Sequence, residues 1–187
     1  MHEALYADQA MTDLRSAPPP PLRDDDHIRG DPAGTPIVFY ADFTCPRCAL
    51  AHERLTAAGA RVVFRHLALR AKHGRAVPAA LAAEAAAAQG LFWDFADLLY
   101  ADQGRVDDPH LWSRARALGL DLARFDEDRR SDATAGRVQR DVRAALAAGA
   151  TMTPTLFAPE IAATGVPDAG WLARLGYDGT VRLPKTS

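Results

Sequence analysis

The sequence predicts an α/β domain that carries an inserted all-helical segment. Three observations support this class. Residues 37–69 pass from strand to helix to strand character, residues 76–149 are helical throughout, and residues 153–176 return to strand character before a short final helix. Short strands that alternate with a helix are typical of a parallel βαβ unit. The predicted order is therefore β-α-β, a helical block, and then β-β-α.

Composition limits the class of protein. The chain has 187 residues, of which 48% are hydrophobic and 25% charged, as expected of a globular domain with a core of its own. The formal net charge is -2, and the arginines are interleaved with acids, so no surface for nucleic acid is expected. No apolar run approaches the length of a membrane span, so no membrane insertion is expected.

Residues 1–30 are interpreted as a leader, and residues 31–187 as the domain. A surface arm is the favoured interpretation of the leader, and a docking arm for a partner is the alternative. Prolines 18–21 break any helix, and an acidic run follows at residues 24–26. One helical face could precede the prolines, formed by Ala4, Ala7, Met11 and Leu14.

The first residues also bear on location. They contain acids and lack the apolar segment of a secretory signal, which predicts a cytoplasmic protein. If a signal has been trimmed from the sequence, an extracytoplasmic location is the alternative.

The first predicted strand is the run Ile-Val-Phe-Tyr at residues 37–40, whose composition suits a strand buried on both faces. It ends at Asp42, and Pro46 suits the first turn of a helix that stops at Gly59. Residues 61–69 are again β-branched and apolar and predict a second strand. Short links between these elements imply a right-handed βαβ unit.

The helical block is divided by capping residues and glycines. Its alanine-rich first helix closes at Gly90. Asp108 is the expected N-cap of a later helix with Pro109 in its first turn, and Asp121 begins a short one. The last helix ends near Gly149. Its expected buried face consists of Val138, Val142, Ala145 and Leu146.

The chain then returns to strand character at residues 153–158, with residues 161–166 as the expected hairpin partner. Residues 168–176 predict a short helix at the end of the domain. This hairpin and helix complete the predicted β-β-α unit.

Both cysteines of the chain, Cys45 and Cys48, lie in the segment "DFTCPRC" at a strand-to-helix junction. Unsatisfied N–H groups and the helix dipole at such a junction favour the thiolate, the reactive form, of Cys45. Cys48 follows one turn later on the same face and is expected to be less exposed. Pro46 restricts the backbone between them, and the Arg47 cation is expected to favour the thiolate further.

This arrangement is suited to thiol–disulfide exchange. Cys45 would form a mixed disulfide with a substrate, and Cys48 would resolve it. No cofactor is expected beyond the redox-active pair. Two alternatives stay open: an inert buried pair, and a metal site in which the pair is joined by His52 and by His66 or His73. The metal is disfavoured because the sequence lacks a second, well-spaced ligand pair.

Ordered blocks of the sequence resemble the DsbA-like thioredoxin-fold oxidoreductases, most nearly the thioredoxin-like domains found alone or fused to bacterial sodium/proton antiporters. The match covers about residues 31–158. The blocks are "FTCPRC", "FRHLAL", "AAEAAAAQGLFWDFADLLY", "LGLDLARF", "RVQRDV" and "TPTLF". The resemblance implies a thioredoxin fold with a helical insertion. It also implies a cis-proline at Pro154, with the backbone of Thr153 pairing with an extended substrate segment.

One position departs from the family. Its members often carry a buried acid six residues before the first cysteine, where it assists proton transfer, and that position is Phe39 here. Asp42 is interpreted first as a turn or helix-entry acid, and a role as proton relay is the weaker alternative.

The sequence therefore predicts a protein-disulfide oxidoreductase with Cys45 and Cys48 as catalytic residues and with Thr153, Pro154, Pro46 and Arg47 at the substrate site. Its expected partners are protein thiol or disulfide substrates and an unidentified recycling partner. A non-catalytic binding or redox-sensing module is one alternative. A glutathione-dependent isomerase is another, which the presence of both cysteines disfavours.

Overall fold

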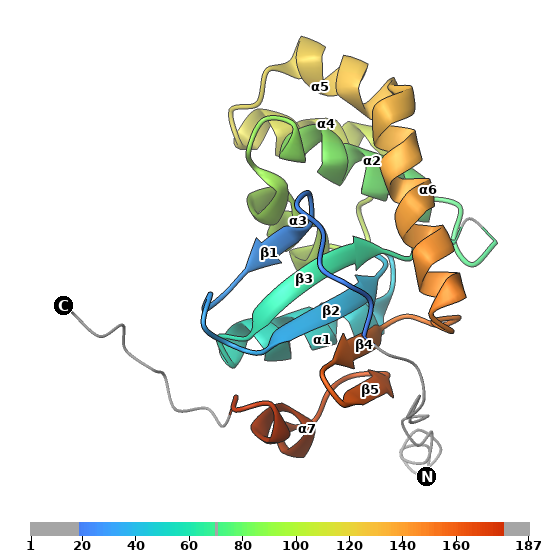
Figure 1. Ribbon diagram of the computed structural model, residues 1–187. Coiled ribbons are helices and arrows are strands. Elements are labelled where there is room, and N and C mark those ends of the chain that lie inside the picture. The colour runs from blue at the N-terminus through green and yellow to red at the C-terminus, as the bar shows by residue number, and fades with distance from the viewer. Residues whose placement is uncertain (1–18, 70, 178–187) are drawn as a thin grey trace, which may run out of the picture.

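The computed structural model describes residues 19–69 and 71–177, and its centre is a mixed five-stranded sheet. The strand order is β1-β3-β2-β4-β5, in which β2 and β3 are parallel and the other neighbours antiparallel (Figure 1). The strands are β1 His27–Arg29, β2 Pro36–Ala41, β3 Arg61–His66, β4 Thr155–Ala158 and β5 Ile161–Thr164. This sheet and its helices confirm the predicted α/β class and the thioredoxin fold.

The described helices divide into two that belong to the βαβ and ββα units, α1 and α7, and five that form the insertion. Figure 1 shows α2 to α5 grouped above the sheet and α6 descending along its side toward β4. The bounds are α1 Pro46–Ala57, α2 Ala76–Ala87, α3 Phe92–Ala101, α4 Asp108–Ala117, α5 Leu122–Arg130, α6 Asp132–Ala147 and α7 Ala169–Arg174. Within the described ranges, no helix combines the length and the apolar character needed to cross a membrane.

The strands β2 and β3 are buried on both faces of the sheet, as the apolar run at residues 37–40 predicts. Phe39 and Phe64 lie side by side in the register and pack into the main core with residues of α1 and α3. The neighbouring positions Val38 and Val63 face the other way and pack against Ala145 of α6. Because both faces are covered, the alternation of side chains along each strand leaves few positions for polar residues.

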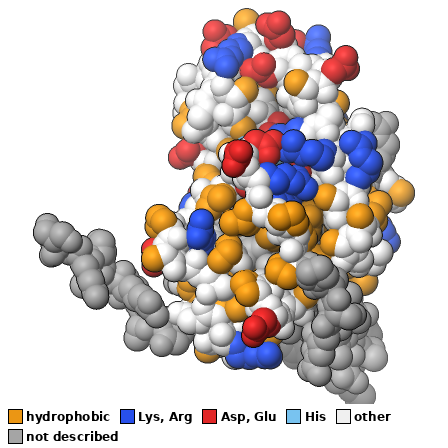
Figure 2. Space-filling view, viewed as in Figure 1, with side chains coloured by type: hydrophobic (Ala, Val, Ile, Leu, Met, Phe, Trp, Pro, Cys, Tyr) orange, Lys and Arg blue, Asp and Glu red, His pale blue; other side chains and the backbone are white. Residues whose placement is uncertain are grey.

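Charged side chains are distributed unevenly on the surface. Figure 2 shows Asp, Glu, Lys and Arg interspersed over the upper, helical part of one face and hydrophobic side chains gathered below them. This mixture agrees with the interleaved charges in the sequence, because neither sign forms an uninterrupted surface there.

Several element ends differ from the prediction by a small shift. The N-cap of α4 is Asp107 rather than Asp108, because the Asp107 side chain accepts a hydrogen bond from the His110 N–H. Asp121 does cap α5, as predicted. Leu146 was expected on the buried face of α6, but it is 48% exposed, whereas the preceding Ala145 is completely buried in the cluster that contains Val38 and Val63 of the sheet.

The N-terminal region differs more. His27–Arg29 were assigned to the leader, yet they form β1, an edge strand antiparallel to β3. The segment before β1 is held by ion pairs: Asp26 with Arg65, and Arg23 with Asp141 at 2.6 Å. These long-range partners explain why a short polar sequence joins the sheet. The predicted helical face at residues 4–14 lies outside the described residues.

Candidate active site

The junction between β2 and α1 is shaped by a turn that Asp42 organises. One carboxylate oxygen of Asp42, Oδ1, accepts hydrogen bonds from the N–H and the hydroxyl of Thr44, each at 2.7 Å. The Asp42 carbonyl accepts from the Cys45 N–H at 3.2 Å. Asp42 is therefore the turn acid that the sequence favoured, and its side chain is buried.

Cys45 occupies the N-cap position of α1, where its own backbone is extended and the helix begins at Pro46. Its side chain is partly exposed, while Cys48 one turn later is completely buried. The two residues are free thiols rather than a disulfide. The sequence-based expectation of an accessible Cys45 and a covered Cys48 agrees with this placement.

The Cys45 thiol is acidic. Its pKa is lowered from the ordinary value to about 6, chiefly by a hydrogen bond from Cys48. Burial opposes this effect, whereas hydrogen bonds from the Thr153 side chain and from the N–H groups of Cys48 and Arg47 add to it. Thiolate is therefore the main form of Cys45 at neutral pH. Arg47 contributes to this lowering of the pKa through its backbone N–H, and its side chain is exposed, so tuning by the guanidinium stays a prediction.

The Cys48 thiol is shifted in the opposite direction. Burial raises its pKa well above the ordinary value, and the hydrogen bond to Cys45 and the Cys45 charge raise it further. A single charge is thus held on the accessible sulfur while the covered sulfur keeps its proton.

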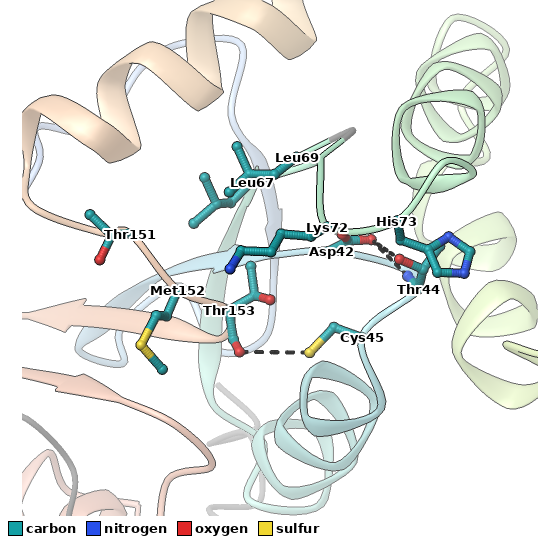
Figure 3. A pocket seen from close by; sticks show the side chains of 10 residues that line it. All are labelled: Asp42, Thr44, Cys45, Leu67, Leu69, Lys72, His73, Thr151, Met152 and Thr153. Atoms are coloured by element: carbon teal, nitrogen blue, oxygen red, sulfur yellow. Dashed lines mark hydrogen bonds between the residues drawn. The ribbon is translucent and has the colours of Figure 1, made fainter.

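Thr153 and Pro154 face this pair from the loop before β4. The Cys45 sulfur lies 3.6 Å from the Thr153 carbonyl oxygen, to which it donates a hydrogen bond when it is protonated; this contact is the dashed line in Figure 3. The Thr153–Pro154 peptide bond is cis. The loop is held by two further hydrogen bonds, from Gly165 N–H to the Pro154 carbonyl at 2.8 Å and from the Thr155 hydroxyl to the Met152 carbonyl at 2.7 Å.

The residues predicted for the site are therefore brought together only in part. Cys45, Cys48 and Thr153 are in mutual contact through hydrogen bonds. Pro46 and Arg47 lie on the exposed first turn of α1 next to Cys45.

A cavity of about 310 Å³ opens beside Cys45, between the loop that follows β3 and the loop before β4. Figure 3 shows the Lys72 side chain extending across it toward Met152 and Thr153, with His73 near Thr44. Its lining combines apolar side chains such as Leu67 and Leu69 with polar ones, which suits an extended peptide with mixed side chains. Its lining consists of Asp42, Thr44, Cys45, Leu67, Leu69, Lys72, His73, Thr151, Met152 and Thr153.

Two histidines of the metal alternative are engaged elsewhere, and the third, His73, lines the cavity beside Cys45, where its Nδ1 accepts from the Arg75 N–H at 3.1 Å. Nε2 of His52 lies 2.8 Å from a carboxylate oxygen of Asp97, and Nε2 of His66 lies 2.7 Å from Glu84. In residues 19–69 and 71–177, no three His, Cys, Asp or Glu side chains are grouped so that they could hold a metal ion.

Two residues near the pair were not singled out from the sequence. The Gln103 side-chain amide donates to the carbonyl oxygens of Phe43 and Cys45, at 2.8 and 2.9 Å, and so fastens the junction to the insertion. Tyr100 packs its ring between Phe43 and His52. Both lie more than fifty positions along the chain from the cysteines, and no local pattern marks such contacts.

Comparison with protein families and curated proteins gives consistent matches. A family model described as thioredoxin matches residues 23–163. The Na(+)/H(+) antiporter NhaA 3 of Salinispora tropica is 41% identical over an alignment of 159 residues that covers 82% of this chain and 24% of that protein. The Na(+)/H(+) antiporter NhaA of Herminiimonas arsenicoxydans is 41% identical over 146 residues, 74% of this chain and 23% of that protein. The chain thus spans about a quarter of the length of these curated relatives.

Solved structures share the fold. A thioredoxin-like oxidoreductase from Silicibacter pomeroyi DSS-3 has a TM-score of 0.73 at 22% identity, covering 88% of this chain and 95% of that one. The thiol-disulfide exchange protein alpha-DsbA2 from Wolbachia pipientis has a TM-score of 0.71 at 18% identity, covering 82% and 86% of the two chains. At these identities, the similarity establishes a common fold.

Proposed function

The chain belongs to the thioredoxin family and has the DsbA-like form of its fold, and from this premise we propose that it is a thiol–disulfide oxidoreductase that acts through Cys45 and Cys48. The observation that carries the proposal is the opposite placement of the two thiols. Cys45 is accessible with a pKa of about 6, and Cys48 is buried with a raised pKa. Such a pair separates the roles of attacking and resolving thiol.

In the reducing direction, the Cys45 thiolate attacks one sulfur of a substrate disulfide. A Cys45–substrate disulfide forms, and the other substrate sulfur leaves as a thiolate and takes up a proton. Cys48 then loses its proton and attacks Cys45, which forms the Cys45–Cys48 disulfide and releases the second substrate sulfur. Two electrons pass from the protein to the substrate. The oxidising direction is the same sequence in reverse.

The proposed substrates are proteins, and the second partner is a redox protein that restores the pair. The Thr153 backbone lies within contact of Cys45, where it can pair with an extended substrate segment next to the reacting sulfur. The cavity beside Cys45 offers room for the side chains of that segment. The redox-active pair itself supplies the electrons, so the proposed reaction requires no other cofactor.

The proposal is tested with two cysteine variants and a dithiol-dependent assay on a protein disulfide. Cys45→Ser is expected to abolish turnover, because the attacking thiolate is lost. Cys48→Ser is expected to accumulate mixed disulfides with substrate, because resolution is lost. Full activity of Cys45→Ser would rule the proposal out.

A second candidate function, a redox-sensing module, is favoured by the match to about a quarter of the antiporter-named relatives. In such a module, the state of the pair would change the binding of a partner rather than process substrates. It predicts negligible turnover together with a partner captured by the oxidised or by the reduced chain alone. Turnover of the intact chain on protein disulfides would exclude it.

A further inference from the structure

The Tyr100 hydroxyl is a buried polar group that the proposed reaction leaves unused. Tyr100 lies near the end of α3, and its hydroxyl has no hydrogen-bond partner among the described residues. Most buried hydroxyls in proteins have such a partner, and an unpaired one destabilises the fold. A phenylalanine would fill the same space without this cost. The hydroxyl therefore calls for an explanation other than packing.

The surroundings of the ring place it against the active-site helix. Its centroid lies 5.1 Å from that of Phe43 and 4.7 Å from that of His52. Phe43 precedes Cys45 by two residues, and His52 follows Cys48 by one helical turn. Phe43, Cys48 and Tyr100 are buried members of one core cluster, which places the ring in the core beside the active-site helix.

The charges that act on the hydroxyl agree with this position. Burial is the largest cause of the raised pKa of Tyr100, and the next is the charge of Cys48, followed by those of Asp42 and Cys45. A phenol with a raised pKa keeps its proton at neutral pH. It is therefore a hydrogen-bond donor and not a base.

Cys48 needs such a donor only while it reacts. As a neutral thiol, it is stable in its buried site, whereas its thiolate is disfavoured by burial. The strand position six residues before Cys45 is Phe39, a completely buried hydrocarbon that cannot assist. The Asp42 carboxylate already accepts two hydrogen bonds from Thr44, and it lines the cavity beside Cys45.

We propose that the Tyr100 hydroxyl donates a hydrogen bond to the Cys48 sulfur as its thiolate forms and attacks Cys45. This step rests on the proposed thiol–disulfide function. The Cys48 proton passes to solvent, the Cys45–Cys48 bond forms, the bond between Cys45 and the substrate breaks, and the substrate sulfur leaves with its electron pair and takes a proton from water. Tyr100 keeps its proton throughout. A hydrogen bond that exists only in the reacting state lowers the barrier without stabilising the resting thiol.

The groups that face this site from each neighbouring element also titrate or carry charge. They are Cys45 at the N-cap of α1, His52 on α1, Asp42 just after β2, and Asp97 on α3, which is paired with His52 at 2.8 Å. Arg29 of β1 adds a positive charge, at 2.8 Å from Asp97 and 3.3 Å from Nε2 of His52. Burial lowers the pKa of His52, so it is neutral above the mildly acidic range. These groups can change the pH profile of either step. For each variant, the rate at which Cys48 resolves the mixed disulfide is therefore compared with the rate at which Cys45 forms it.

The test is Tyr100→Phe in the full chain, with Tyr177→Phe as a matched control. The Tyr177 hydroxyl is satisfied: it accepts from the Arg61 N–H at 2.9 Å and donates to the Thr35 carbonyl at 2.6 Å. Reduced protein is mixed with a small symmetrical disulfide, quenched with acid at intervals, and separated by mass spectrometry into reduced, mixed-disulfide and oxidised forms. Urea unfolding is measured for both variants.

We expect Tyr100→Phe to form the mixed disulfide at the wild-type rate but to resolve it roughly tenfold more slowly near neutral pH, because a hydrogen bond to a charged sulfur is lost while nucleophilicity partly compensates. Its urea midpoint should equal or exceed that of the wild type. Tyr177→Phe should show the reverse, a lower midpoint and an unchanged resolution rate. Wild-type resolution by Tyr100→Phe, equal slowing of both steps, or a lowered midpoint would each overturn the proposal.

A second measurement separates this inference from the proposed function. In the Cys45→Ser background, Cys48 is the single thiol, and its ionisation can be followed by the ultraviolet absorbance of the thiolate. Adding Tyr100→Phe should move the midpoint to higher pH, and an unchanged midpoint would refute the hydrogen bond. If the wild-type chain forms no mixed disulfide, the proposed function fails, while this titration still decides the role of Tyr100.

Discussion

The Cys45 sulfur lies 3.6 Å from the carbonyl oxygen of Thr153, although 108 residues separate the two in the chain. Between them in sequence lie α1, β3 and the whole helical insertion, α2 to α6. The pairing of β4 with β2 brings the two loops together, because both loops adjoin paired strands at the same end of the sheet. The reactive thiol and the proposed substrate-pairing backbone are thus positioned by the sheet rather than by a local motif.

The acidity of Cys45 should appear directly in its alkylation. With a pKa of about 6, the thiolate predominates above that pH and is lost as pH falls through it, so the rate of alkylation by iodoacetamide should fall with a midpoint near pH 6. Because the hydrogen bond from Cys48 is the largest cause, Cys48→Ala should raise the midpoint. A midpoint near that of an ordinary thiol in the intact chain would contradict this account of the site.

A variant of Arg47 can distinguish an effect of its backbone N–H on the Cys45 pKa from an effect of its guanidinium. Its contribution to the Cys45 pKa comes through the backbone N–H, which any residue except proline supplies. Arg47→Ala should therefore leave the alkylation midpoint within about half a pH unit of the wild type, because the exposed guanidinium is screened by solvent. A shift of a full unit or more would restore the role that the sequence suggested for the side chain.

Much of this site was predictable because it is local. A strand of apolar residues, a helix start at Pro46 and two cysteines one turn apart together predict an exposed and a covered thiol. The contacts of Gln103 and Tyr100 were not predictable, since each comes from α3 or the turn that follows it and depends on how the insertion packs.

The sheet was predicted with one omission, β1. Its sequence, His-Ile-Arg, is too short and too polar to show a strand pattern, and an acidic run precedes it. The strand forms because it can pair with β3 at the edge of the sheet. The preceding segment is fixed by the buried ion pair between Asp26 and Arg65. Contacts with residues far away in the chain produce no periodic pattern in the sequence of the strand itself, so a local analysis misses it.

The buried ion pair of Asp26 and Arg65 tests this explanation. Both side chains are 1% exposed, and Arg65 Nη2 lies 2.7 Å from Asp26. Asp26→Asn should lower the free energy of unfolding by about 3–5 kcal/mol, because it leaves a buried guanidinium without its counter-charge. Urea unfolding monitored by tryptophan fluorescence measures this loss.

The adjacent residue supplies the control for Asp26. Asp25 also pairs with arginines, Arg137 and Arg140, but its side chain is 48% exposed. Asp25→Asn should cost less than about 1 kcal/mol. If both variants lost equally little stability, the segment before β1 would be a loosely attached arm, as the sequence first suggested.

Glu84 joins two histidines inside the domain and should make stability depend on pH. Its Oε1 lies 2.8 Å from Nε2 of His27 and 2.7 Å from Nε2 of His66, and its Oε2 lies 2.8 Å from Nε of Arg137. Burial would raise the pKa of Glu84, but the hydrogen bonds from the histidines lower it far below the ordinary range. The stability from Glu84 is therefore present above about pH 4.5, the usual value, and is lost as the pH falls below it.

His27 should make the stability of the domain depend on pH in a higher range than Glu84 does. Burial lowers its pKa, and the hydrogen bond to Glu84 only partly offsets this. The unfolded chain binds a proton at this residue below about pH 6.5 while the folded chain does not, so stability should begin to fall there, by up to about 1.4 kcal/mol per pH unit. His27→Gln keeps a donor for Glu84 and cannot titrate. It should flatten the dependence of unfolding free energy on pH below about 6.5.

The matched control for His27 is His110→Gln, at a histidine on α4 whose side chain is 43% exposed and lies 2.6 Å from the cap residue Asp107. It should cost less than about 1 kcal/mol of stability, because an exposed pair contributes little. A residual slope in His27→Gln is expected from His52, whose pKa burial also lowers. Equal slopes for His27→Gln and the wild type would show that His27 is protonated inside the fold, with its charge balanced by Glu84.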